Sequence, residues 1–380
     1  MTAALDVALF VAGLAIVAVT LNSAVRYTML PRGVTAPLAR RVALATRVIF
    51  TLRAGRSPSY ERRDRIMAMY SPVILLALLT TWLVMLIGAF TAMYLGVGVR
   101  PVRDAFELSG SAIVTLGTAS ARGFAANALT YAEAGLGLLL LTLLITYLPT
   151  IYSAFSRREA VVTLLEVRAG SPPSAVEMLI RFHRIGQRDR LAGLWRRWEQ
   201  WFVELEETHT SFPTLAYFRS PQPDHSWVVA AGTVLDAASL WAGVIEHPND
   251  PDAQLCIRAG SLALRRIGAY FNLPFNANPQ PIDPITISRY EFDEACRSMA
   301  NAGVPLKADR DAAWEAYAGW RVNYDTILLN LARMTEAPLA PWVSDRSPLL
   351  ADQVWTLRAA VRLASPTTRR RRSRRRAPQG

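Results

Sequence analysis

Three long stretches of the sequence carry no charged side chain and consist mainly of apolar residues. They run from Val7 to Val25, from Ser71 to Val99 and from Ala134 to Ser156. About 20 helical residues, each rising 1.5 Å, cross the hydrocarbon core of a bilayer. Charged residues make up only 19% of the chain, which is below the usual quarter of a soluble domain. We therefore predict an all-α integral membrane protein with three transmembrane helices.

The first stretch has two interpretations, a cleaved signal peptide or a retained anchor. Asp6 precedes it, no lysine or arginine stands before it, and no A-x-A site is followed by a secreted-looking sequence. These features favour an anchor.

A fourth apolar stretch, Trp227 to Ile245, contains Asp236 near its centre. A carboxylate at the middle of a membrane helix costs about 2.5 to 3.5 kcal/mol on insertion scales. We therefore expect a buried helix of a soluble domain. If this stretch crossed the membrane instead, the C-terminal tail would lie outside the cell.

The arginines indicate the orientation in the membrane. Ten lie between the first two spans, whereas only Arg100, Arg103 and Arg122 lie between the second and third. Loops rich in arginine remain cytoplasmic. We expect a multi-pass protein of the inner (plasma) membrane, with the N-terminus and residues 100–133 outside and everything after Arg157 inside.

The segment Asp104 to Thr118 is apolar and small, but too short to cross a bilayer. Such lengths fit a re-entrant or interfacial piece. Asp104 is placed to cap a helix and Glu107 lies in its first turn, where the helix dipole favours carboxylates. We predict a helix from Asp104 to about Thr115, followed by a turn through Ser120 and Gly123.

This order of span, short helix, extended loop and span is that of a cation pore. Irregular backbone at membrane depth must be buried in protein or line a water-filled cavity, and backbone carbonyls can replace the hydration shell of an ion. We predict a pore loop at 104–123, a permeant monovalent cation and a homotetramer, because one chain supplies a single hairpin. The predicted selectivity residues are Thr115, Leu116, Gly117, Thr118 and Ala119.

Four strings of the sequence resemble a bacterial potassium-channel-like family of the two-helix, one-pore-loop type, often called the two-pore-domain potassium channel family. They are Ala105–Gly117, Leu148–Glu159, Arg168–Ser174 and Glu207–Ser220. The resemblance implies a potassium-type channel fold.

The filter of that family reads Thr-x-Gly-Tyr-Gly-Asp. Thr115 and Gly117 match it, whereas Thr118, Ala119 and Ser120 replace the tyrosine, the second glycine and the acid. A side chain on left-handed backbone costs about 1 to 2 kcal/mol. We expect a wider, weakly selective pore or one that does not conduct. Alternatively, the segment is a periplasmic helix in which Gly110 and Gly117 allow close packing.

The third span contains two candidate gate residues, Gly135 toward its outer end and Pro149 toward its inner end. Pro149 removes a helix hydrogen bond and favours a kink, so it could shape the inner mouth. Equally, prolines are common in membrane helices that have no gate.

Five regions follow: an anchor at 1–30, a basic linker at 31–70, a pore module at 71–156, a helical domain at 157–365 and an arginine-rich tail at 366–380. In the linker, Ala36 to Leu52 mixes apolar residues with arginines, which suits either an interfacial helix or an ordinary linker helix. Apolar spacing predicts further helices. These cover Ala175–Glu207, Trp227–Ile245, Ala253–Tyr270, Tyr290–Asn301, Asp309–Met334 and Leu349–Leu363.

Catalytic and metal-binding patterns are missing from the sequence. It has no His-x-x-x-His pair, Walker loop, G-x-G-x-x-G or G-x-S-x-G, and two cysteines, Cys256 and Cys296, cannot form a disulfide framework. We expect no enzyme activity, no cofactor and no metal. His209 and Asp236 could form a couple, although satisfied structural groups are the commoner case. Trp195, Trp198 and Trp201 are expected to be core anchors.

The tail is too charged to pack and is expected to be disordered. Its arginines account for seven charges of the net +12 and are Arg369, Arg370, Arg371, Arg372, Arg374, Arg375 and Arg376. Anionic lipids attract each arginine near the membrane by about 1 kcal/mol. Nucleic acid is a weaker candidate because no aromatic residue is interleaved for stacking.

Two functions remain open from the sequence. The first is a cation channel subunit regulated by its helical domain. The second is a non-conducting, membrane-anchored scaffold or signalling protein that kept the channel fold. High alanine and arginine content is typical of a GC-rich bacterium.

Overall fold

The computed structural model is all-helical, as predicted, in the residues that it describes. These are residues 2–28, 37–55, 59–120, 122–187, 190–247 and 250–346. Within these ranges the only β-type pairing is an isolated bridge between Ile245 and Leu306. The predicted helix Leu349–Leu363 and the whole arginine-rich tail lie outside the described residues.

Four helical segments are long and apolar enough to cross a membrane. They comprise α1 (Thr2–Thr28), α3 (Tyr60–Ala68) with α4 (Tyr70–Gly96), α6 (Phe124–Ala169) and α9 (Trp227–Val244). In α9, 94% of the apolar window is covered by the rest of the chain, against 17 to 39% in the other three. Lipid or another chain can therefore contact α1, α4 and α6, whereas α9 already has a protein environment.

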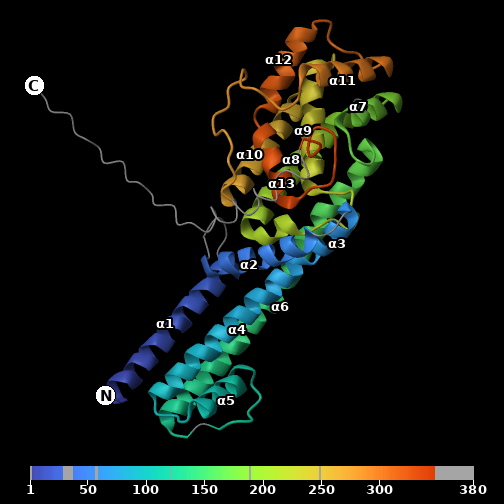
Figure 1. Ribbon diagram of the computed structural model, residues 1–380. Coiled ribbons are helices and arrows are strands. Elements are labelled where there is room, and N and C mark those ends of the chain that lie inside the picture. The colour runs from blue at the N-terminus through green and yellow to red at the C-terminus, as the bar shows by residue number, and fades with distance from the viewer. Residues whose placement is uncertain are drawn as a thin grey trace, which may run out of the picture. The chain divides into compact units, whose positions relative to one another are not determined.

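Helices α1 and α4 pack along their length (Figure 1). At one end Arg100 forms an ion pair of 2.6 Å with Asp6. Farther along, the Trp82 indole N–H donates to the Ser23 hydroxyl at 3.3 Å. These contacts anchor α1 to α4.

Helix α6 is one element of 46 residues, about 69 Å long at 1.5 Å per residue. The sequence placed the end of the third span at Ser156, just before two arginines. The helix continues past them to Ala169, and Arg158 within it is buried and hydrogen-bonded. Its guanidinium donates to Glu159 and to the backbone carbonyls of Leu215 and Phe218 at 2.7 to 2.9 Å.

The helix predicted at 36–52 is observed as α2 (Pro37–Ala54), and α3 follows it. The hydroxyl of Ser59 caps α3 by accepting from the Arg62 amide. Figure 1 shows α2 lying across the direction of α1, α4 and α6, at the end of these helices where the remaining helices begin.

Residues 175–346, hereafter the helical domain, pack around α9 (Figure 1). Each of two predicted helices is divided into two in the structure. The predicted helix Ala175–Glu207 is interrupted at Gly186, and the predicted helix Asp309–Met334 is interrupted at Asn323. Trp195, Trp198 and Trp201 are core residues, as predicted. The elements besides α9 are α7 (Ala175–Arg184), α8 (Leu191–Ser211), the 3-10 helix η2 (Pro213–Tyr217), α10 (Pro251–Tyr270), α11 (Arg289–Asn301), α12 (Arg310–Arg321) and α13 (Asp325–Thr335).

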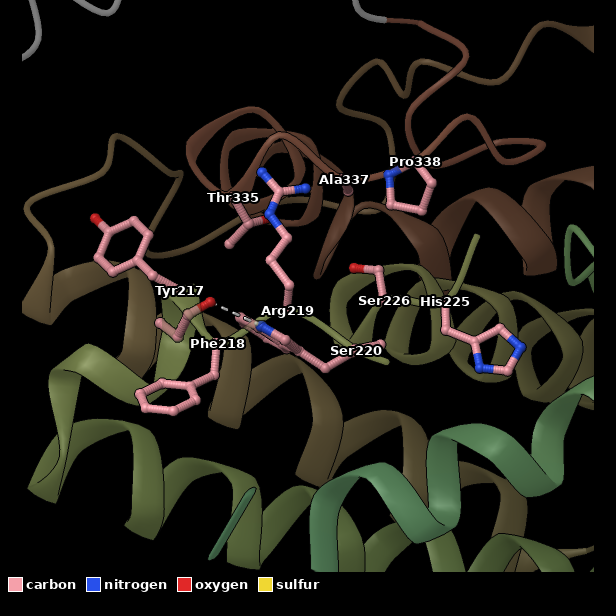
Figure 2. A pocket seen from close by; sticks show the side chains of 11 residues that line it. Tyr217, Phe218, Arg219, Ser220, His225, Ser226, Thr335, Ala337 and Pro338 are labelled. Atoms are coloured by element: carbon pink, nitrogen blue, oxygen red, sulfur yellow. Dashed lines mark hydrogen bonds between the residues drawn. The ribbon is translucent and has the colours of Figure 1, made fainter. Parts of the chain in front are cut away.

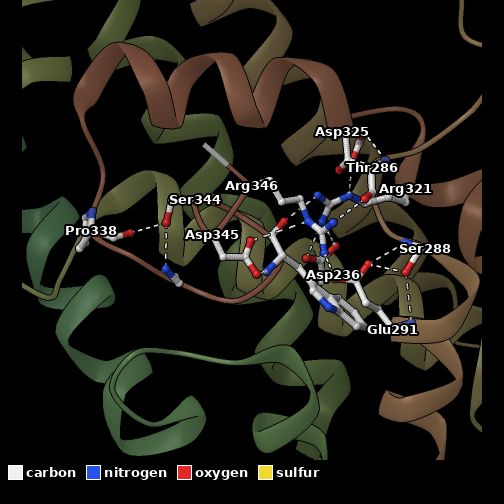
Figure 3. A network of polar contacts seen from close by, with 12 residues as sticks. Asp236, Thr286, Ser288, Glu291, Arg321, Asp325, Pro338, Ser344, Asp345 and Arg346 are labelled. Atoms are coloured by element: carbon white, nitrogen blue, oxygen red, sulfur yellow. Dashed lines mark hydrogen bonds and ion pairs between the residues drawn. The ribbon is translucent and has the colours of Figure 1, made fainter. Parts of the chain in front are cut away.

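A buried ionic network ties α9, α12 and α13 together (Figure 3). Arg321 is fully buried and donates to both oxygens of Asp236, at 2.5 and 2.6 Å, and to Asp325 at 2.7 Å. Its third contact is the Trp342 carbonyl at 2.8 Å. The hydroxyl of Tyr324 donates to Asp236 at 2.8 Å. Asp236 is thus neutralised within the protein.

A couple between His209 and Asp236 is not formed. His209 Nδ1 lies 2.9 Å from the Leu205 carbonyl, and its Nε2 lies 3.2 Å from the Arg158 guanidinium. Burial, reinforced by the positive charge of Arg158, lowers the pKa of His209 well below its usual value. The ring is therefore a neutral core group.

Candidate functional site

The candidate site is the segment between α4 and α6, which begins with the short helix α5 (Val102–Ile113). Its N-cap is Pro101, so the predicted cap at Asp104 is wrong; Asp104 lies in the first turn instead. The helix also ends at Ile113 rather than Thr115, because the backbone of Thr115 is left-handed, with φ of 54°.

Helix α5 runs back alongside α4 and α6 (Figure 1). Ser109 contacts the carbonyl of Ile87, nine residues before the end of α4, a depth of about 14 Å. The carbonyl of Ile113 lies against Gly137, where an added Cβ would approach to 2.2 Å. Gly137 is 13 residues inside α6, a depth of about 20 Å. The C-terminal end of α5 therefore lies well within the length of its neighbours.

The loop after α5 directs its amides back to the last turn of α5. The Leu116 amide donates to the Ser111 carbonyl at 2.9 Å. The amides of Thr118 and Ala119 both donate to the Ser111 hydroxyl, at 2.9 and 3.2 Å. Ser111 thus accepts hydrogen bonds from three loop amides, one at its carbonyl and two at its hydroxyl.

These amide contacts decide where the loop carbonyls point. In a trans peptide the carbonyl of one residue points opposite to the amide N–H of the next. The carbonyls of Thr115, Gly117 and Thr118 are therefore directed away from α5. Within the described ranges, no donor reaches any of the three.

The conformational strain of the loop lies at Thr115. Among the described residues of the loop, φ is positive at Thr115 (54°), Gly117 (67°) and Gly123 (91°), but not at Ala119, which stands for the second glycine of the potassium-type filter. Gly117 adopts a left-handed backbone freely, whereas the same conformation costs about 1 to 2 kcal/mol at Thr115, which has a Cβ. Residues 114–118 are all exposed in the single chain, and Leu116 is 67% exposed.

A buried polar clamp, which the sequence analysis missed, holds α5 between its neighbours. Glu133 of α6 is fully buried, and its Oε1 lies 2.5 Å from the Ser109 hydroxyl. That hydroxyl also lies 3.1 Å from the Ile87 carbonyl of α4. A hydroxyl has one proton, so both bonds form together only when neutral Glu133 donates to Ser109 and Ser109 donates to Ile87. The available signal was a lone carboxylate directly before an uncharged run.

We expect Glu133→Gln to retain this clamp, because the amide is uncharged and can donate to Ser109. Glu133→Asp, although it keeps the acid, is one methylene too short and leaves a buried polar group unpaired, at a cost of about 1 to 3 kcal/mol. Thermal unfolding of the purified chain in detergent measures both. Equal destabilisation by the two substitutions would contradict a neutral clamp.

The candidate gate residues lie on the uncovered side of α6. Gly135 is exposed with open space around it, and Pro149 is exposed inside the continuous helix. The gate therefore stays a prediction. Large apolar side chains share this exposure, among them Leu138, Leu141, Ile145, Leu148 and Tyr152.

The helical domain contains a hollow of about 20 Å³ between residues 216–227 and 335–338 (Figure 2). One water molecule needs about 10 to 15 Å³ of such space, so the hollow is too small for an organic ligand. The Ser220 hydroxyl and His225 ring border it without hydrogen-bond partners, although His225 Nε2 lies 3.3 Å from Glu166. Across the described ranges, no three His, Cys, Asp or Glu side chains gather as a metal site.

Comparison of the chain with protein-family models, with curated proteins and with solved structures yields no match.

Proposed function

We propose that this chain is a channel-like membrane subunit that conducts monovalent cations as a homotetramer. The observation that carries the proposal is the direction of the Thr115, Gly117 and Thr118 carbonyls, away from α5. The loop starts from the end of α5, which contacts α6 about 20 Å from the first residue of α6. Carbonyl oxygens without donors are the groups that replace water around a cation in a pore. The resemblance of the loop to a potassium-type filter agrees with this assignment.

The proposed topology has three membrane helices, α1, α4 and α6. Their apolar side chains are largely uncovered, whereas those of α9 are buried and its Asp236 is paired with Arg321. The arginine distribution favours an N-terminus outside and a helical domain in the cytoplasm, and we propose the inner membrane of a bacterial cell as the location. In this topology α5 is a re-entrant pore helix.

The proposal requires several copies of the chain, because one chain provides only one loop and does not cover the exposed side of that loop. The exposed residues 114–118 and the uncovered apolar side of α6 are the surfaces that other copies would cover. Irregular backbone in a membrane needs protein or a water-filled cavity around it. Four subunits around one axis provide both, with the loops lining the axis and the helical domains regulating the inner mouth.

The loop chemistry favours weak selectivity. Thr118 and Ala119 replace a bulky aromatic residue and a glycine of the potassium-type filter, so less side-chain volume is available to hold the loop at a fixed radius. We therefore propose a permeability that differs little between potassium and sodium.

The test is cation flux into vesicles that contain the purified chain. We expect the parent to pass potassium and sodium, and Gly117→Val to lose most of this flux, because a β-branched residue is a strong outlier at a φ of 67°. Gly193→Val is the matched control. Gly193 is an exposed residue of α8 with open space around it, so flux should persist. If folded parent protein passes no ions, the non-conducting scaffold function replaces the channel.

A further inference from the structure

Helix α2 has two chemically distinct faces. One is exposed and consists of Arg41, Ala45, Val48, Ile49, Leu52 and Arg53, hereafter the outer face. At 100° per residue these six positions fall within an arc of about 140°. Ile49 and Leu52 are 64% and 65% exposed. The outer face is thus an uncovered apolar patch with an arginine toward each end.

The opposite face of α2 is held by protein contacts. Arg47 donates to the Met334 carbonyl at 2.7 Å and to the Tyr217 hydroxyl at 3.0 Å. Phe50 packs edge-on against Tyr70, the first residue of α4, and the Tyr70 hydroxyl donates to the Ala43 carbonyl at 3.1 Å. This fixed face makes α2 a rigid link between α4 and the helical domain.

Helix α3 adds a second link to the same place. Arg63 pairs with Glu336 at 2.8 Å, directly after α13. In return, Arg219 of the helical domain pairs with Asp64 of α3 at 2.8 Å, and both side chains are nearly buried. With α2 and α3 held in this way, the outer face of α2 points away from the described part of the chain that these contacts join.

We propose that the outer face of α2 binds the surface of an anionic lipid leaflet. Helix α2 lies across α1, α4 and α6 at one end of these spans (Figure 1), which is the plane of a membrane surface if those helices cross the bilayer. A helix in that plane buries apolar side chains at the acyl boundary and keeps arginines among the headgroups.

The positive charge of the outer face favours anionic lipids. Neither Arg41 nor Arg53 has a carboxylate partner in the described part of the chain, and no acidic residue lies in α2. Lipid phosphates, with an additional negative headgroup charge, complement such a face. The inference uses the proposed membrane topology but is independent of ion conduction.

Site-specific labelling tests the position of the outer face. The native Cys256 and Cys296 are buried, so Ile49→Cys can be labelled with a fluorophore in the full chain, reconstituted with phosphatidylcholine and phosphatidylglycerol. We expect quenching by nitroxide lipids and protection from aqueous iodide. Val203→Cys in α8, 60% exposed like Ile49, is the matched control and should show the reverse. Iodide access at Ile49 equal to that at Val203 would overturn the proposal, as would protection from both quenchers, which indicates a protein partner.

A charge variant tests the lipid class separately. For the parent, we expect lipid quenching at Ile49 to be several-fold stronger with phosphatidylglycerol than with phosphatidylcholine alone. Adding Arg41→Gln and Arg53→Gln should remove this difference. The control pair Arg258→Gln and Arg297→Gln removes two exposed arginines of the helical domain and should leave it intact. Recognition of anionic lipid is refuted if the Arg41 and Arg53 variant retains the full difference.

Discussion

Arg321→Met is expected to destabilise the helical domain more than any other substitution considered for this protein. The side chain of Arg321 is 0% exposed, and its removal leaves the carboxylates of Asp236 and Asp325 buried without their cation. Breaking a buried ion pair from one side costs about 3 to 5 kcal/mol, a large part of the total stability of about 5 to 15 kcal/mol of a typical domain. Thermal and denaturant unfolding, followed by tryptophan fluorescence, measure the loss.

Arg266→Met is the matched control for this prediction. Arg266 also approaches both oxygens of one carboxylate, Glu206, at 2.8 and 3.0 Å, but its side chain is 60% exposed. Exposed pairs contribute about 0 to 1 kcal/mol. A similar loss for the two variants would show that burial of the Arg321 network does not set its strength.

Gly137→Ala is expected to separate α5 from α6 and to reduce cation flux together with stability. A Cβ at this position would lie 2.2 Å from the Ile113 carbonyl and 3.0 Å from the Ile113 side chain. Because the carbonyl belongs to the last residue of α5, the helix must move and carry the loop with it. Overpacking of this kind costs about 1 to 3 kcal/mol. Unfolding in detergent and flux in vesicles are the two measurements.

Gly135→Ala, two residues earlier in α6, provides the comparison. Gly135 has nothing within 4 Å of an added Cβ, and alanine favours a helix over glycine by about 1 kcal/mol. We expect unchanged or increased stability. If Gly137→Ala behaves like Gly135→Ala, the close contact between α5 and α6 is not needed for the loop.

The long helices were predictable because the absence of charge over about 20 residues is a local property of the sequence. The full extent of α6, to Ala169, was not predictable from the uncharged run, which ends at Ser156. Arg158 donates hydrogen bonds to the carbonyls of Leu215 and Phe218, about 60 residues away in the sequence. No local sequence pattern predicts these contacts. In α9, by contrast, Asp236 within an apolar run did predict a helix buried by protein, and Arg321 supplies the physical reason.

The candidate site was predictable only in outline. A short apolar segment with small residues located α5 and its loop, but the sequence placed the helix cap at Asp104 rather than Pro101 and did not predict the left-handed backbone of Thr115. The Ser111 contacts that direct the loop amides, and the clamp of Glu133 with Ser109, depend on side chains that meet only after α5 folds back. The spacing of these residues in the sequence does not predict that α5 folds back against its neighbours.

Helix α6 joins the loop end of the chain to the helical domain without a break in its helical assignment, from Phe124 to Ala169. Between Gly137 and Arg158 the helix runs about 32 Å, so a tilt of about 5° at one of these residues displaces the other by about 3 Å. Gly137 touches α5 and Arg158 is bonded into the helical domain, so α6 connects α5 directly to that domain. A small tilt of α6 at the helical domain would thus shift the end of α5 by ångströms, with Pro149 between the two contacts at the point where the helix lacks one backbone hydrogen bond.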